Sequence, residues 1–256
     1  MILFRLTLWT LWARKTWVVV YLAMLALPFA LPHIAPVEEL PKLVQPARAQ
    51  AAWQLAWLLG IFWGLSQAAR LGDGNSRTGV GNLLRSQGVG SLSQMLSLWL
   101  GLMVYLVPVA LMATLICVTA AAPSYDGEKG MWWTTNLHFA LLYLLAMGPL
   151  ALLGIGISSR FGAMVGLMVP VALALYGLHG VGYLGDTIRM GGNPILEWAY
   201  ILSPHYHLAD LTPRLLFKMG GLAGDALAEY VMYFLLLGLV MAAAARLLFK
   251  TEPLRS

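Results

Sequence analysis

The polar stretch from Arg70 to Ser91 holds the residues of this sequence that are best suited to contacting a partner protein. It lies between long apolar runs and carries three arginines, Arg70, Arg77 and Arg85, against one acid, Asp73. In a membrane protein this charge bias is typical of a cytoplasmic loop, because basic loops stay on the cytoplasmic side. The sequence therefore predicts a cytoplasmic loop over residues 70–91.

A short helix is predicted in the second half of this loop, over residues 79–86. Its apolar side chains would share one side and arginines would lie near its ends, which would suit docking on a cytoplasmic partner. The alternative is that the arginines only fix the orientation of the chain in a membrane. The residues concerned are Val80, Leu83, Leu84, Arg77 and Arg85.

Histidines and acids near the carboxyl end are the other residues with chemical potential. His205 and His207 could offer two imidazoles to a metal in an extended segment, because alternate residues share a face. No His-Glu-x-x-His motif accompanies them and no third ligand can be named, which favours histidines of an outer loop. Asp225 and Glu229 stand one helical turn apart. Glu229 is either an intramembrane acid with a functional role or a side chain that reaches water outside.

Motifs of enzymes are absent from the sequence. It contains no Gly-x-x-x-x-Gly-Lys-[Ser/Thr] loop for nucleotide phosphates, no Gly-x-Ser-x-Gly elbow and no paired carboxylates in mid-membrane. The single cysteine, Cys117, excludes an intrachain disulfide and a cysteine-based metal cluster, and its apolar surroundings predict a buried thiol. We therefore expect neither catalysis nor a bound cofactor or metal in this chain.

The elements that carry these residues must be apolar helices. Of the 256 residues 60% are hydrophobic and 11% are charged, and the mean hydropathy is +0.75. Soluble domains contain about 25% charged residues. The net charge of +5 comes from basic residues at the edges of apolar runs, where membrane orientation explains them and nucleic acid is not required. The composition predicts an all-α protein in a lipid bilayer.

Six transmembrane helices are predicted, in a single transmembrane domain over residues 1–256. About 20 apolar residues cross a hydrocarbon core roughly 30 Å thick. An interfacial helix is expected over residues 1–15, with a cleaved signal peptide as the alternative, and short interfacial or re-entrant helices are expected on the outer face over residues 186–225. The predicted spans are 16–37, 49–69, the run between Arg85 and Asp126, 130–159, 161–185 and 226–248.

The distribution of charge predicts a multi-pass protein of the cytoplasmic (inner) membrane with both termini in the cytoplasm. In this orientation the outer segments hold most of the acids, from Glu38 to Glu229, and the inner segments hold only Asp73 and Glu252. The basic residues of the inner segments would be Arg5, Arg14, Lys15, Arg70, Arg77, Arg85, Arg160, Arg246, Lys250 and Arg255.

Two predicted spans contain glycines at the spacing that lets helices approach closely. They are Gly60 and Gly64 in the second span, and Gly162 and Gly166 in the fifth. They could mark helix contacts, or they could reflect chance among 26 glycines. Four further residues of the fifth span could line a substrate path or pack against neighbours. These are Met164, Met168, Tyr176 and His179.

Taken together, these features resemble the permease, or membrane subunit, of type-2 ABC transporters. The resemblance lies in the opening segment 3–15, the polar loop with Ser76-Arg77-Thr78-Gly79 and Leu83-Leu84-Arg85-Ser86, and the Leu202-Ser203-Pro204 segment before the last span. It extends over nearly the whole chain as topology and weak motifs. The loop departs from the family pattern because it has Gly88 and Gly90 in place of an acid and a proline.

The resemblance implies half of an ATP-driven exporter. Two copies of the permease, or the permease and a paralogue, would form a dimer, packed through Gly60, Gly64, Gly162 and Gly166. Separate ATPase subunits would bind ATP and Mg and would grip the inner loop, the coupling helix of this family, through Arg77, Leu83, Leu84 and Arg85. The substrate would pass along the dimer axis, and its identity is not readable.

Other functions fit parts of the same sequence. A haem or copper subunit would use His179, His205 and His207, and an intramembrane enzyme would need a site of this kind too. An ion-coupled carrier would use Glu229 and would have an inverted internal repeat, which the sequence does not display. A purely structural membrane scaffold would require none of these residues.

Overall fold

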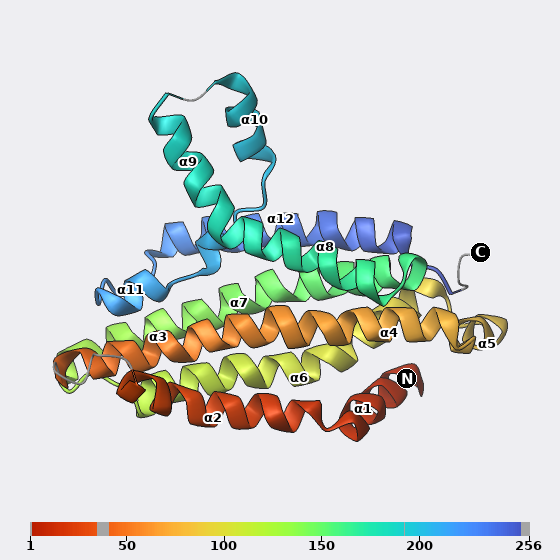
Figure 1. Ribbon diagram of the computed structural model, residues 1–256, viewed down its shortest axis with the longest axis horizontal. Coiled ribbons are helices and arrows are strands. Elements are labelled where there is room, and N and C mark those ends of the chain that lie inside the picture. The colour runs from red at the N-terminus through yellow and green to blue at the C-terminus, as the bar shows by residue number, and fades with distance from the viewer. Residues whose placement is uncertain (1, 35–40, 192, 252–256) are drawn as a thin grey trace.

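The computed structural model describes residues 2–34, 41–191 and 193–251, which form a bundle of long helices (Figure 1). No strand occurs among these residues, so the predicted all-α class is confirmed. In chain order the helices are α1 (Ile2–Arg14), α2 (Thr16–Ile34), α3 (Pro41–Leu59), α4 (Leu65–Arg77), α5 (Val80–Ser86), α6 (Ser91–Thr119), α7 (Asp126–Phe161), α8 (Ala163–Leu175), α9 (Val181–Arg189), α10 (Pro194–Leu202), α11 (Thr212–Leu216) and α12 (Gly224–Leu248).

Two π-helical turns join neighbouring helices without a break. Gly60–Gly64 connects α3 to α4, and Tyr176–Gly180 connects α8 to α9. In each turn a backbone N–H bonds to the carbonyl five residues earlier, from Leu65 to Gly60 and from Val181 to Tyr176. The chain is therefore helical from residue 41 to 77 and from residue 163 to 189.

Four helices are long and apolar enough to cross a membrane: α6, α7, the continuous helix Ala163–Arg189, and α12. A fifth is present if α1 and α2, which are bent by 65° at their junction, count as one span. The protein is therefore a multi-pass membrane protein. Of the six predicted spans, the one over residues 49–69 is not among these helices, because Gln50, Gln54 and Gln67 interrupt its apolar character.

Helix α7 lies at the centre of the bundle and contacts α4, α6, α8 and α12. An aromatic stack fixes α3 against it: the rings of Trp53 and Phe139 are 4.0 Å apart between centroids. Trp53 Nε1 also donates to Asn136 Oδ1 at 2.8 Å, and the Tyr143 hydroxyl donates to the Ala56 carbonyl at 3.0 Å. These buried polar groups are paired within the chain, as the absence of water in a hydrocarbon core requires.

The four glycines predicted to pack a dimer are all buried inside this chain. A Cβ at Gly64 would lie 2.8 Å from Leu106 Cδ2, and one at Gly162 would lie 2.9 Å from Arg77 Nη2. Additional atoms at Gly60 and Gly166 would overlap Tyr143 and Ser158. The glycines allow the close approach of helices of the same chain, and they leave no exposed surface for the dimer contact that was predicted for them.

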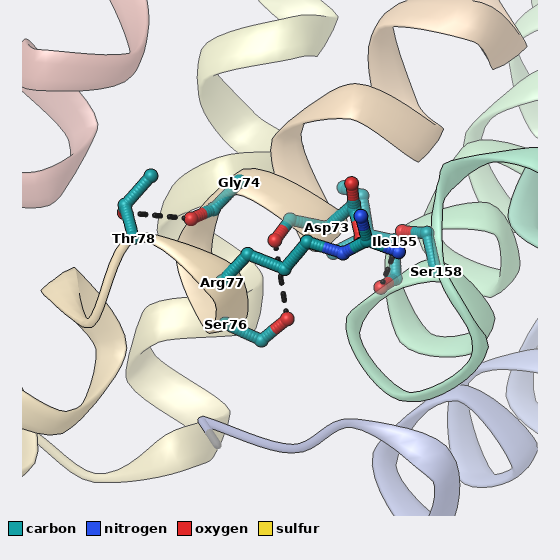
Figure 2. Close-up of polar contacts among 7 residues, drawn as sticks. All are labelled: Asp73, Gly74, Ser76, Arg77, Thr78, Ile155 and Ser158. Atoms are coloured by element: carbon teal, nitrogen blue, oxygen red, sulfur yellow. Dashed lines mark hydrogen bonds and ion pairs between the residues drawn. The ribbon is translucent and has the colours of Figure 1, made fainter. Parts of the chain in front are cut away.

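The loop predicted over residues 70–91 starts later than expected, because α4 continues to Arg77. Gly72 allows this: any Cβ there would overlap Ile155 O and Ser158 Oγ of α7, so α4 and α7 are in backbone contact. One turn further, Arg77 Nε pairs with Asp73 Oδ1 at 2.7 Å (Figure 2). An i,i+4 ion pair of this kind stabilises a helix. Only residues 78–90 leave the long helices.

The outer segment also differs from its prediction. Helix α9 begins before residue 186 as a continuation of the fifth predicted span, and with α10 it forms a hairpin that projects from the side of the bundle (Figure 1). In the second half of the stretch 186–225, where short helices were predicted, the chain forms a 3-10 turn, Tyr206–Ala209, and α11. Asp210 divides them, because its Oδ1 accepts from both the backbone N–H and the hydroxyl of Thr212.

The two ends of the bundle differ in charge. The amino terminus, α5 and the carboxyl terminus lie at one end (Figure 1), which we call the α5 end. Here Arg14 Nη1 donates to Gln67 Oε1 at 3.0 Å, and the Lys250 N–H donates to Ser159 Oγ at 3.0 Å. At the other end Lys218 pairs with Glu128 at 2.7 Å. Four charged residues for which a side of the membrane was predicted lie outside the described residues: Glu38, Glu39, Glu252 and Arg255.

Candidate functional site

The short helix predicted within the polar stretch is present as α5, with glycines at both ends. Gly79 precedes it with a φ of +76°, and Gly88 follows it with a φ of +84°. The Gly88 N–H bonds to Arg85 O at 3.0 Å and the Val89 N–H to Leu84 O at 2.9 Å. This pair of bonds is the Schellman arrangement that ends a helix at a left-handed glycine. Gly88, a departure from the family pattern, therefore defines the end of α5.

A buried amide network fastens α5 to the two long helices beside it. Gln94, in the first turn of α6, has no exposed surface, and its Nε2 donates to Gly81 O and to Val89 O, each at 3.0 Å. Its Oε1 accepts from Asn75 Nδ2 of α4 at 3.1 Å. Hydrogen bonds buried in a low-dielectric interior are costly to lose. Gln94 and Asn75 therefore brace α5 between α4 and α6.

The two leucines of α5 differ in exposure. Leu83 is 59% exposed, whereas Leu84 is 7% exposed and belongs to the apolar core. Arg85 is exposed as well. Leu83 and Arg85 are thus available to a partner, whereas Leu84, for which the same contact was predicted, packs in the apolar core of its own chain.

Arg77 is the last residue of α4. Besides Asp73 it approaches the turn between α7 and α8, where its Nη2 would be 2.9 Å from a Cβ at Gly162. Nearby polar groups close on their own helices: Ser76 Oγ donates to Asp73 O at 3.1 Å, and Thr78 Oγ1 to Gly74 O at 2.7 Å (Figure 2). Arg77 therefore approaches the α7–α8 turn, and because its side chain is 66% exposed, its contact with a partner stays a prediction.

The predicted substrate-path residues lie on the outward face of α8 and the π turn that follows it. Met164, Met168 and Tyr176 are 71%, 54% and 41% exposed, and His179 is exposed as well. The Tyr176 hydroxyl shares a hydrogen bond of 2.8 Å with Ser203 Oγ. These exposed side chains would line a path only together with another molecule packed on this face.

His205 and His207 come close together but hold no complete metal site. Their ring centroids are 5.4 Å apart, and the His205 N–H donates to the Tyr233 hydroxyl at 2.7 Å. Burial lowers the pKa of His207, and the charge of His205 acts in the same direction. Among the described residues no three His, Cys, Asp or Glu side chains are grouped for a metal. The side chain of His33 lies outside that description.

Three other residues singled out in the sequence make no contact that suggests a site. Asp225 and Glu229 are both exposed in the first turns of α12. Cys117 is fully buried, with its Sγ 3.8 Å from Ala49 O, as its apolar surroundings predict.

Asn75 and Gln94 are the residues of the candidate site that the sequence analysis did not identify. Their types gave only a weak signal, two amides on either side of a short helix. The two carbonyls that Gln94 binds come within its reach only in the folded chain, where α5 lies between α4 and α6, so the sequence does not indicate these bonds.

Comparison of this chain with protein-family models, with curated proteins and with solved structures finds no match. The braced helix α5 and the exposed helix faces are therefore the features from which its function must be inferred.

Proposed function

We propose that this chain is the permease subunit of an ATP-driven exporter of the type-2 ABC kind. It would lie in the cytoplasmic membrane with the α5 end and both termini in the cytoplasm, and a separate ATPase subunit would bind ATP and Mg. The observation that supports this proposal best is α5 itself. It exposes Leu83 and Arg85 at the basic end of the bundle and is fixed by buried amides to two long helices.

An ATPase can drive transport only if its closed state is linked in free energy to a changed arrangement of the membrane helices. Helix α5 suits such a linkage because both of its ends are hydrogen-bonded to Gln94 rather than held by a slack loop. Movement of α5 would pass to α6 through Gln94 and to α4 through Asn75. The backbone contact at Gly72 would then transmit this movement from α4 to α7.

Six spans remain the topology that we propose, with the continuous helix 41–77 as the second. This helix packs against α6 and α7, and its Gln67 is buried and accepts from Arg14, so this amide need not face lipid. Helix α1 would lie at the inner interface. The α9–α10 hairpin exposes Tyr183, Ile195 and Trp198 and would form the outer re-entrant element.

We assign the contact with a second copy, or a paralogue, to the outward face of α8. This face replaces the four glycines, which are buried, and it exposes Met164 and Met168. Tyr176 and His179 continue it towards the outer end, so that two facing copies would enclose a path lined by these side chains.

Leu83→Asp tests the role of α5. Because Leu83 is exposed, we expect normal insertion and a normal unfolding temperature. A partner cleft would have to bury an unpaired carboxylate, which costs roughly several kcal/mol, so the variant should lose its ATPase. The measurement is ATP hydrolysis that co-purifies with the tagged chain from native membranes. Ser93→Asp is the control, because it places the same charge on the exposed first turn of α6. Undiminished co-purification with Leu83→Asp would refute the docking role.

A further inference from the structure

A cavity of about 230 Å³ lies at the α5 end, between α1, α4, α5 and α6. Leu6 and Leu98 form part of an apolar wall, and Arg14 of α1 and Arg70 of α4 line it from two different helices. One water molecule occupies about 30 Å³ in the liquid, so the cavity has room for a group of several heavy atoms. It is therefore an apolar recess with two guanidinium groups beside it.

The two arginines are the charged hydrogen-bond donors of this cavity. Asn75 Nδ2 is used on Gln94, and the hydroxyls of Thr10 and Thr78 donate to carbonyls of their own helices. Arg14 uses one N–H on Gln67 Oε1, out of the five that a guanidinium carries. Within the described part of the chain no carboxylate forms an ion pair with either arginine.

We propose that this cavity binds a phosphate group between Arg14 and Arg70. Guanidinium groups match phosphate oxygens in charge and in planar geometry, and two of them without an acid favour an anion. Arginines that serve only to orient a membrane protein need to reach water, but they need not converge from separate helices on one recess. The site does not depend on the proposed transport activity.

The position of the cavity favours the phosphate of an inner-leaflet phospholipid. Leu6 and Leu98 would contact the apolar part of the lipid while the arginines hold its headgroup, and anionic lipids are concentrated on the cytoplasmic leaflet. A free phosphate ion offers the same chemistry without the apolar part. Either occupant would touch Thr78 and Val80, which line the cavity at the junction of α4 and α5.

The test is thermal unfolding of the purified chain in nanodiscs of phosphatidylcholine with increasing phosphatidylglycerol. We expect phosphatidylglycerol to raise the unfolding temperature. With Arg14→Gln or Arg70→Gln, the amount needed for half of this gain should increase by about tenfold, because a charge-assisted contact is lost. Arg70 makes no side-chain hydrogen bond or ion pair within the described residues, so its variant should fold normally. Arg246→Gln removes an exposed charge that does not line the cavity and should keep the full gain.

A second arm identifies the source of the phosphate. The chain in neutral detergent is heated with inorganic phosphate, and with chloride at the same ionic strength. Stabilisation by phosphate that requires Arg14 and Arg70 would support the site with a free ion as occupant, and stabilisation by the lipid alone would support the lipid. If neither stabilises the chain, if both variants keep the full gain, or if Arg246→Gln loses as much as they do, the proposal is wrong.

Discussion

Gln94 links three segments of the α5 end through a single buried side chain, which bonds to Gly81 O, Val89 O and Asn75 Nδ2. Leu84 supports the same arrangement from the apolar side. The residues that a partner could touch, Leu83 and Arg85, are therefore held by residues that it could not reach.

Replacement of Gln94 should release α5 without unfolding the bundle. Gln94→Leu leaves two buried carbonyls and one buried amide without partners, at a cost of about 1–3 kcal/mol for each group that stays dry. We expect faster hydrogen exchange of the α5 amides and a lower unfolding temperature. Gln87→Leu, at an exposed position next to α5, is the control and should change neither. If exchange in α5 is the same in both variants, the amide network does not brace it.

His207 should make the turn Tyr206–Ala209 sensitive to acid. Burial lowers its pKa in the folded chain below the ordinary value of 6.5, so the unfolded chain binds the proton more strongly. The associated stability is complete above pH 6.5 and is lost as the pH falls below it. Acidification from about pH 7.5 to about pH 5.5 should therefore lower the unfolding temperature of the His207→Gln variant less than that of the unmodified chain. Equal changes in the two proteins would contradict this assignment.

At the scale of helices, the close approach of α4 to α7 is the contact that shapes the α5 end. Gly72 permits it, and the ion pair of Asp73 with Arg77 extends α4 beyond it. Without this contact α4, which α5 follows in the chain, would not be held against α7, the central helix of the bundle.

Two glycines of α4 offer a matched test of this contact. Gly72→Ala should destabilise the protein by roughly 1–3 kcal/mol, because its Cβ would press on the backbone of α7. A Cβ added at Gly74 would meet no atom within 4 Å. Gly74→Ala should therefore be neutral or should stabilise the helix by about 0.5–1 kcal/mol. The measurement is the unfolding temperature of each variant in detergent. Equal effects of the two substitutions would show that α4 and α7 do not touch at Gly72.

At the scale of the whole molecule, charge and shape favour the same orientation. The basic residues of α1, α4 and α5 and those at the ends of α7 and α12 gather at the α5 end, where both termini lie (Figure 1). The positive-inside rule favours the cytoplasm for such an end, which is the orientation that we propose.

Two single cysteines check this orientation. Ser86 of α5 and Ser124 in the turn before α7 are both exposed, and the native Cys117 is fully buried and should stay unreactive. In intact cells an impermeant thiol reagent should modify Ser124→Cys and should modify Ser86→Cys only after permeabilisation. Modification of Ser86→Cys from outside would reverse the orientation and remove α5 from the reach of a cytoplasmic ATPase.

The sequence by itself determined the all-α class, the membrane location, the presence of α5 and the burial of Cys117. These features depend on local properties: long apolar runs, charges at their edges, and glycines that can adopt a positive φ before and after a short helix. Each can be read within a window of about 20 residues.

Only the tertiary structure decided how far α4 extends, which leucine of α5 is free and what the paired glycines contact. Periodicity shows which side chains share a face, but it does not show which other segment covers that face. Gly72 meets residues of α7, Gly64 meets Leu106, and Gln94 finds its acceptors on a helix that has folded back. These contacts join positions that are distant in the sequence or turned around a tight bend, so the packing of the whole bundle selects them.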